Sequence, residues 1–348
     1  MELTTFWFIT ISVLWIGYFV LEGFDFGVGV LLKTVAKTQA ERRAVLTTLG
    51  PLWDGNEVWL LVAGGATFAA FPEWYATLFS GFYLPLFLIL MALIVRGVAM
   101  EYRSKYGDEK WRARWDNAIV VSSFVPALLW GVAFANIVRG VPLEVQNNVI
   151  EYTGGFFNLL NPYGLLGGMV TLSVFMTHGA IFLALKTEGA IRERARTIAT
   201  KIGLFAAVVT VAFLAITVTA YNDKLEVYGL AAIVAIAWLA ALGSNLRGRE
   251  GYAFLYSSIA LAFAVITLFS ALYPNVMPSS LLESASLTIN NASSTPYTLK
   301  VMTYVAVVLT PIVLLYQGWT YWVFRKRINA AQIPSPETGV LDFSKLSK

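Results

Sequence analysis

Long apolar runs separated by short polar segments dominate the chain. A helix that crosses a membrane needs about 20 mostly apolar residues. The first and last runs exceed this length and have room to tilt, while the second is short. The pattern predicts nine transmembrane helices, at approximately 3–32, 53–71, 77–98, 118–138, 163–185, 198–220, 227–246, 253–273 and 299–324.

The basic residues fall on alternate connections between these runs. All but three of the 25 Lys and Arg lie at or in every second connection, beginning with the first, or after the last run. The exceptions are Arg139, Lys224 and Lys300. Because Lys and Arg collect on the cytoplasmic side of a membrane, this alternation predicts an odd number of spans, an N-terminus outside and a C-terminus in the cytoplasm.

Composition gives the same class of protein. Hydrophobic residues make up 57% of the chain and charged residues only 13%, about half of the charged fraction of a typical soluble protein. The chain is therefore expected to be an all-α integral membrane protein with one transmembrane domain, residues 1–325, and a polar cytoplasmic tail, residues 326–348. The run at 3–32 is too long for a signal-peptide core and lacks a basic leader, so it is expected to remain as a helix.

Several kinds of site are excluded. The chain has no cysteine, which excludes disulfides, zinc–thiolate sites and iron–sulfur clusters. No Rossmann or phosphate-loop signature occurs. The net charge of +4 is explained by a basic cytoplasmic edge and does not indicate nucleic acid. Two outer connections are longer, 140–162 and 274–298, and the second is expected to fold over the outer face without regular structure.

Four acidic residues carry the candidate chemistry. Glu22 and Asp25 lie in the inner half of the first predicted helix, three positions apart and therefore on one face. Asp54 and Glu57, also three apart, begin the second predicted helix, so all four are expected at one depth near the inner surface. Carboxyl groups inside a membrane are costly and are usually paired, hydrated or functional. Linked by water, they are suited to passing protons.

A structural interpretation of these acids stays open. They can instead pair with Arg96, Arg42 or Arg43. An acid at the start of the second helix can also stabilise the positive end of its dipole.

His178, the single histidine, lies in the fifth predicted helix. A buried histidine can ligate haem iron, with Met169 or Met176 as a second ligand. The favoured interpretation is a hydrogen-bonded polar side chain between helices, which implies that this chain holds no haem of its own.

The residues alone leave two classes of function open. One is a secondary transporter that uses the acids for proton or cation coupling. The other is a subunit of a respiratory complex that conducts protons toward the cofactors of a partner.

Several sequence blocks, in order, resemble subunit II of the cytochrome bd-type quinol oxidases, and the resemblance runs from about Gly17 to Phe324. The blocks include Gly-Phe-Asp-Phe-Gly-Val-Gly at 23–29, Glu-Arg-Arg at 41–43, Trp-Asp-Gly-Asn-Glu-Val-Trp-Leu at 53–60, Ala-Gly-Gly-Ala-Thr-Phe-Ala-Ala-Phe-Pro at 63–72, Asn-Pro-Tyr-Gly-Leu-Leu-Gly-Gly at 161–168 and Val-Met-Pro-Ser-Ser at 276–280.

This resemblance implies a haem-free subunit of an enzyme in the bacterial cytoplasmic (inner) membrane that oxidises quinol and reduces oxygen to water. Two b-type haems and one haem d are expected in subunit I, the partner. The implied fold is two four-helix bundles plus a peripheral helix, with helices 2, 3 and 9 facing subunit I. Small single-span accessory subunits and a structural quinone are further possible partners.

Carried over by position, the resemblance assigns Asp54 to a cytoplasmic proton route toward subunit I. It places Asp25 or Glu22 on the same route. Glu57, which follows Asp54 by three residues, is the fourth candidate. Trp53 is the residue expected near a bound quinone. The connection at 221–226 is shorter than in some members of the family.

Overall fold

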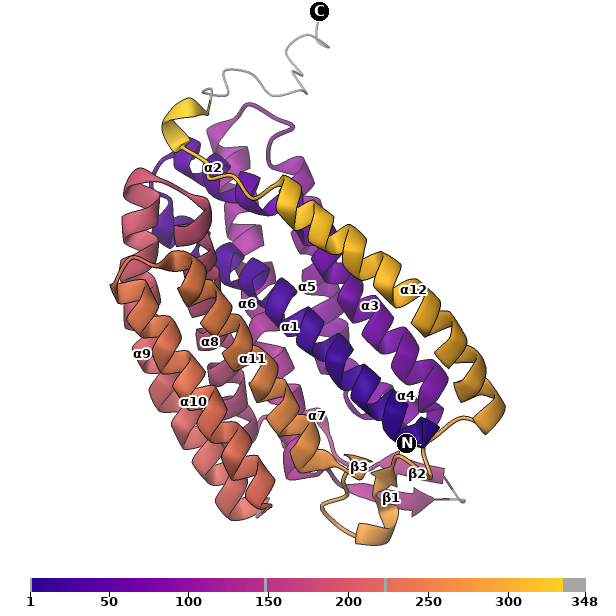
Figure 1. Ribbon diagram of the computed structural model, residues 1–348. Helices are drawn as coiled ribbons and strands as arrows, with labels where there is room; N and C mark the ends of the chain where they lie inside the picture. Colours follow the sequence, from indigo (N-terminus) through magenta and orange to yellow (C-terminus); the bar gives the residue numbers. More distant parts are fainter. Residues whose placement is uncertain (1, 147–148, 222–223, 334–348) are drawn as a thin grey trace, which may run out of the picture.

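A bundle of long helices forms the protein, with two small two-stranded sheets at one end (Figure 1). The computed structural model describes residues 2–146, 149–221 and 224–333. Its α-helices are α1 (Leu3–Val35), α2 (Gln39–Leu49), α3 (Trp53–Ala70), α4 (Pro72–Gly81), α5 (Tyr83–Tyr102), α6 (Glu109–Arg139), α7 (Phe156–Leu159), α8 (Pro162–Lys186), α9 (Gly189–Ile216), α10 (Leu225–Leu246), α11 (Glu250–Leu272) and α12 (Pro296–Val323). The other elements are β1 (Leu143–Gln146), β2 (Val149–Tyr152), β3 (Asn275–Met277), β4 (Leu287–Thr288), the π-helix η1 (Thr217–Tyr221) and the 3₁₀ helices η2 (Glu283–Ala285) and η3 (Ala330–Gln332).

Eight helices in the described part of the chain are long and apolar enough to cross a membrane: α1, α5, α6, α8, α9 continued by η1, α10, α11 and α12. These match eight of the nine predicted spans, so the all-helical membrane architecture is confirmed. The remaining predicted span, 53–71, forms the 18-residue helix α3. Three polar residues in its first two turns, Asp54, Asn56 and Glu57, reduce its apolar character.

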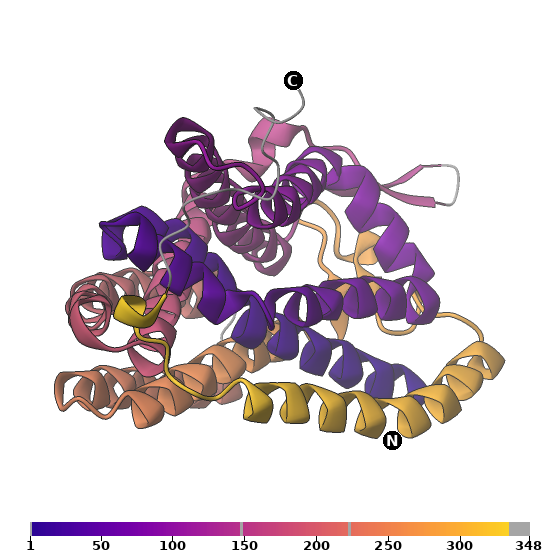
Figure 2. The ribbon, with the colours of Figure 1, turned by 90° about the horizontal axis from the view of Figure 1, so that it is seen from above.

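The long helices fall into two groups with one helix outside them. The first group lies in the first half of the chain, where α1 packs against α3 and α6, and α6 packs against α5. In the second group α8 packs against α9, and α10 packs against α11. Contacts of α8 with α1 and α6 join the two groups. Helix α12 runs along the outside of α1 and α3 (Figures 1 and 2), and Leu299 is its one buried residue.

The third predicted span, 77–98, is wrong in detail, because two helices meet inside it. Helix α4 opens with Pro72, whose missing N–H is not needed in a first turn. It ends at Gly81, and α5 begins at Tyr83. A continuous helix would set the ring of Pro85 against the carbonyl group of Gly81, four residues earlier, and Pro85 has no N–H to donate to that carbonyl.

The polar connections hold more structure than the pattern predicts. The first one contains α2, which starts with a capping box between Thr38 and Glu41. Burial by itself raises the pKa of the Glu41 carboxyl, but hydrogen bonds from Lys37, Arg194 and Thr38 hold that pKa below its usual value. The segment 274–298, expected to be irregular, includes β3, η2 and β4. Of the predicted tail, 326–348, the structure describes residues 326–333, and the rest lies outside the described residues.

The end of the bundle that carries α2 is held by ion pairs between helices. Asp116 of α6 accepts hydrogen bonds from Arg42, at 3.0 Å, and Arg103, at 2.5 Å. Glu250 of α11 pairs with Arg192, at 2.6 Å, and Arg327, at 3.4 Å. These pairs tie α2, α9 and the segment after α12 to the rest of the bundle at one end.

Helix α12 is fixed at both ends. At one end the Nζ of Lys186 donates hydrogen bonds to the carbonyl oxygens of Phe324 and Lys326. At the other end the indole N–H of Trp7 donates to the carbonyl oxygen of Leu299, at 3.1 Å, and to the Thr303 hydroxyl, at 3.1 Å. A helix that buries so little of its surface therefore keeps a defined position along α1.

The crossing of α1 and α8 depends on Gly27. A Cβ atom at this position would lie well inside van der Waals contact of the Phe175 carbonyl oxygen and 3.1 Å from the Gly179 Cα. Both neighbours are backbone, so the helices must separate to accept it. We predict that Gly27→Ala destabilises the protein by about 3 kcal/mol, seen as a lower midpoint of thermal unfolding in detergent.

Gly229→Ala on α10 is the matched control, because a Cβ there meets nothing within 4 Å. It should keep the wild-type midpoint. A wild-type midpoint for Gly27→Ala as well would show that the close backbone approach of α1 and α8 does not constrain the bundle.

Candidate functional site

Glu22 and Asp25 lie on the buried side of α1, and neither side chain is exposed at all. Their three-residue spacing places both on one face of α1, as the sequence predicts, and this face meets residues of α3 and α5. One oxygen of each carboxyl, Glu22 Oε2 and Asp25 Oδ1, has no hydrogen-bond partner in the described part of the chain. Each carboxyl therefore keeps one oxygen able to exchange a proton or bind water.

Arg96 of α5 supplies the positive charge of this cluster. Its Nη1 donates a hydrogen bond to Glu22 Oε1, and the guanidinium lies 4.9 Å from the centre of the Phe26 ring. The side chain is almost fully buried, and its Nε and Nη2 have no partner among the described residues. The pairing with Arg96 weighed from the sequence is therefore present for Glu22.

Asn56 of α3 links Asp25 to α12. Its Nδ2 donates to Asp25 Oδ2, at 2.8 Å, while its Oδ1 accepts from Tyr321, at 2.7 Å, and from Gln317, at 3.1 Å. Asn56 is fully buried, so these bonds are made away from bulk water. Buried amides with all their partners hold a fixed orientation.

Glu57 is more exposed than Glu22 and Asp25, and Asp54 is more exposed still. Glu57 is partly buried and interacts electrostatically with both Arg96 and Asp54. Asp54 is exposed in the first turn of α3 and makes no hydrogen bond or ion pair with the described residues. Asp54 makes no capping hydrogen bond, but its place in the first turn is where an acid interacts favourably with the helix dipole. Arg42 pairs with Asp116 rather than with any of the four acids. The four predicted acids thus form a series from an exposed carboxyl to two buried ones.

Trp53 is partly buried at the start of α3, beside α5. A Cβ atom at Gly97 would lie 3.4 Å from the Trp53 ring, so a glycine at this point of α5 gives the indole its space. The assignment of Trp53 to a bound quinone stays a prediction.

Three polar residues of the site were not predicted. Asn56 lies within the block at 53–60, but an amide does not titrate, so a search for proton carriers does not single it out. Gln317 and Tyr321 are four residues apart in the last predicted helix, which places them on one face. The sequence feature that points to this pair is Gln317 itself, a glutamine in an otherwise apolar span.

His178 is a hydrogen-bonded side chain between helices, as the sequence interpretation favoured. Its Nδ1 lies 2.8 Å from the Ser257 hydroxyl, its Nε2 lies 3.1 Å from the Val20 carbonyl oxygen, and its ring stacks on Phe254. Both ring nitrogens are engaged within the protein. In the described residues no group of three or more His, Cys, Asp or Glu side chains is arranged to hold a metal ion.

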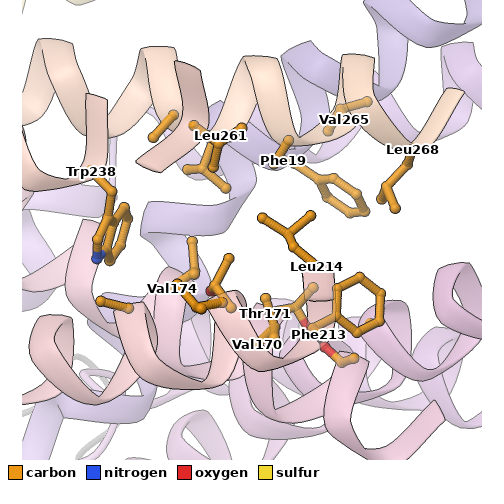
Figure 3. A pocket seen from close by; sticks show the side chains of 18 of the residues that line it. Phe19, Val170, Thr171, Val174, Phe213, Leu214, Trp238, Leu261, Val265 and Leu268 are labelled. Carbon is orange, nitrogen blue, oxygen red and sulfur yellow. Dashed lines mark hydrogen bonds between the residues drawn. The ribbon is translucent and has the colours of Figure 1, made fainter. Parts of the chain in front are cut away.

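A cavity of about 190 Å³ lies away from these acids, among α6, α8, α9, α10 and α11 (Figure 3). None of its lining residues has a titratable side chain. Among its few polar groups, the Thr171 hydroxyl donates to the Ala127 carbonyl oxygen and the Trp238 indole to that of Gly203. The cavity is therefore suited to hydrocarbon rather than to a charged group.

A polytopic helical membrane protein with a buried acid cluster is the class that this geometry defines. Residues 3–324 match the family model described as cytochrome bd terminal oxidase subunit II, and the chain belongs to that family. It is a multi-pass protein of the bacterial inner membrane and a component of a membrane quinol oxidase complex.

Individual relatives agree with the family model. The chain is 40% identical to cytochrome bd ubiquinol oxidase subunit 2 of Bacillus subtilis (strain 168), over 93% of this chain and 96% of that protein. It is 38% identical to cytochrome bd-I ubiquinol oxidase subunit 2 of Escherichia coli (strain K12), over 94% and 95% of the two chains. A solved chain of the bd oxidase from Geobacillus thermodenitrificans shares the fold, with a TM-score of 0.75, 19% identity and coverage of 94% of this chain and 100% of that one.

The buried ion pair predicts a non-additive mutant series. Arg96→Leu leaves Glu22 and Asp25 buried without a cation, and breaking a buried pair in this way costs about 3–5 kcal/mol. The double variant Glu22→Leu, Arg96→Leu removes both charges and should recover part of that loss. The midpoint of thermal unfolding of the purified complex measures each variant.

Equal midpoints for the single and double variants would contradict a direct pairing of Glu22 with Arg96. Arg325→Leu serves as a control, because this exposed arginine lies at the end of α12 and contacts Trp322 rather than an acid.

Proposed function

We propose that this chain conducts protons from the cytoplasm to the oxygen-reducing site of the quinol oxidase, which is carried by a haem-bearing subunit I. The observation that carries the proposal is the series of carboxyls from exposed Asp54 through Glu57 to buried Glu22 and Asp25. The last three interact with the Arg96 guanidinium. Oxygen reduction to water consumes protons, so a haem-free subunit contributes by delivering them. Acids inside a membrane bundle typically mark such relays.

The direction of delivery rests on an orientation that we also propose. Helix α3 would be a ninth span, because it runs beside α1 (Figure 1). The end of the bundle with α2 and its ion pairs would face the cytoplasm, where Lys and Arg collect. Asp54, in the first turn of α3, then lies on the cytoplasmic side and is the entry group.

The contact with subunit I would involve α3, α5 and α12, which correspond to predicted helix 2, most of predicted helix 3 and predicted helix 9. These helices expose large apolar side chains along their length, including Leu61 and Phe68 of α3 and Leu315 of α12. Apolar exposure also suits lipid, but α12 and α3 border the acid cluster through Gln317 and Asn56. A partner on this face is therefore close to the end of the proton route.

The family match favours the oxidase over the transporter that the residues alone left open. We keep the structural quinone beside Trp53 and the small accessory subunits as proposals. Within this chain the residues of the relay, rather than a bound cofactor, carry the expected chemistry.

The ninth span and the orientation predict a labelling pattern, which the absence of native cysteine makes simple to read. Lys37 precedes α2 and α3, and Glu73 follows α3. In intact spheroplasts, a membrane-impermeant maleimide should label Glu73→Cys and not Lys37→Cys. Lysis should make both reactive. Labelling of both before lysis, or of Lys37→Cys alone, would contradict the proposed crossing of α3.

The proton route predicts a loss of turnover in Asp54→Asn and Glu57→Gln. Removing a proton-transfer group slows the step it serves by about a hundredfold or more, unless water bridges the gap. Oxygen consumption of the assembled complex at saturating quinol is the measurement. Haem content must be checked first in the visible spectrum, because a variant can also impair assembly.

Glu73→Gln is the matched control, since this exposed acid begins α4 near the opposite end of α3. It should keep wild-type turnover. Normal turnover and normal generation of membrane potential in a haem-replete Asp54→Asn complex would remove Asp54 from the route.

A further inference from the structure

Asn56 holds the polar contacts of three helices together inside the site. Beside its bonds to Asp25, Gln317 and Tyr321, its Nδ2 lies 3.4 Å from the Leu21 carbonyl oxygen. Both sides of the amide are therefore occupied. The nitrogen faces acceptors on α1, and the oxygen faces donors on α12.

The two donors on α12 determine which way the amide points. If the amide were reversed, its NH₂ group would face the NH₂ group of Gln317, and that hydrogen bond would be lost. With Oδ1 accepting from Gln317 and Tyr321 and the Leu21 carbonyl, which can only accept, facing Nδ2, the Asn56 Nδ2 donates to Asp25 Oδ2. An oxygen that accepts this bond is a poor place for the acid proton, since a carboxyl O–H would then point at N–H.

We propose that Asn56, oriented by Gln317 and Tyr321, is a positioning residue that keeps the exchangeable proton of Asp25 on Oδ1. Oδ1 is the oxygen without a hydrogen-bond partner in the described chain, so it is the one open to a proton donor or acceptor. The inference rests on the proposed function, because it concerns how Asp25 gains and loses a proton on that route.

Removing the side-chain donors of Gln317 and Tyr321 should move the exchangeable proton of Asp25 from Oδ1 to Oδ2. Without them the Asn56 amide can turn, and its Oδ1 can accept a hydrogen bond from a proton on Asp25 Oδ2. Neutral Asp25 is then stabilised, and proton release becomes slower. The charged and titratable groups that act on Asp25 are Glu22 on α1, Glu57 on α3, Arg96 on α5 and Tyr321 on α12. The double variant Gln317→Leu, Tyr321→Phe leaves every charge among them in place.

The test is infrared difference spectroscopy of the assembled oxidase during a pH change. The carbonyl stretch of neutral Asp25 is the band that Asp25→Asn abolishes. In the wild type this carbonyl is Oδ2, which accepts from Asn56. In the double variant it becomes Oδ1, which accepts no hydrogen bond from the Asn56 amide, so the band should shift to higher frequency. The alkaline limb of the turnover profile should also move to higher pH, with a lower maximum rate.

Tyr252→Phe is the control, because Tyr252 is an exposed tyrosine of α11, a helix outside the face proposed for subunit I. It should leave the band and the profile unchanged. An Asp25 band at the wild-type frequency in the double variant, or no Asp25-dependent band at any pH, would overturn the positioning role. Normal turnover of Asp25→Asn would instead overturn the proposed route and leave the band assignment intact, so the two failures can be told apart.

Discussion

The site depends on the burial of Glu22 and Asp25 beside a single guanidinium. Charges removed from water are tolerated only when they are paired, hydrogen-bonded or neutralised by protons. Arg96 pairs with Glu22, and Asn56 donates to Asp25. With Glu57 also near Arg96, carboxyls outnumber the basic groups in contact with them. An excess of acids in a low-dielectric site is costly unless bound protons neutralise it, which is why the proposed function centres on these groups.

The bundle is arranged to keep these groups together. Close backbone contact at Gly27 holds α1 against α8, and α1 in turn presents its acids to α3 and α5. Helix α12 buries little surface but is fixed by Trp7 at one end, by Lys186 at the other and by Asn56 between them. A peripheral helix thereby reaches the buried acids and also borders the face proposed for the partner. Whatever binds that face can influence how the Asn56 amide is held.

Much of this could be predicted from the sequence, because the strongest signals in a membrane protein are apolar length and the placement of basic residues. The spacing of Glu22 and Asp25 placed them on one buried face. The break between α4 and α5 was missed because Pro85 acts on a carbonyl group four residues earlier, inside a run that stays apolar. Helix α2 was missed because it is short and polar.

The polar network was missed for a different reason. Asn56, Gln317 and Tyr321 come from helices more than 250 residues apart in sequence, and no local spacing relates them. A single sequence also does not show which of Arg42, Arg43 and Arg96 pairs with a given acid. That choice depends on the packing of α5 within the first group of helices, which places Arg96 beside Glu22 and leaves Arg42 with Asp116.

Proton uptake in a single turnover tests the central claim most directly. The fully reduced complex, oriented in liposomes with a pH indicator on the side that carries α2, is mixed with oxygen while haem oxidation and proton uptake are followed together. If the buried acids deliver the protons, Asp25→Asn should leave the early electron transfer unchanged and slow both proton uptake and the haem oxidation coupled to it. Proton uptake at the wild-type rate in a haem-replete Asp25→Asn complex would contradict the account.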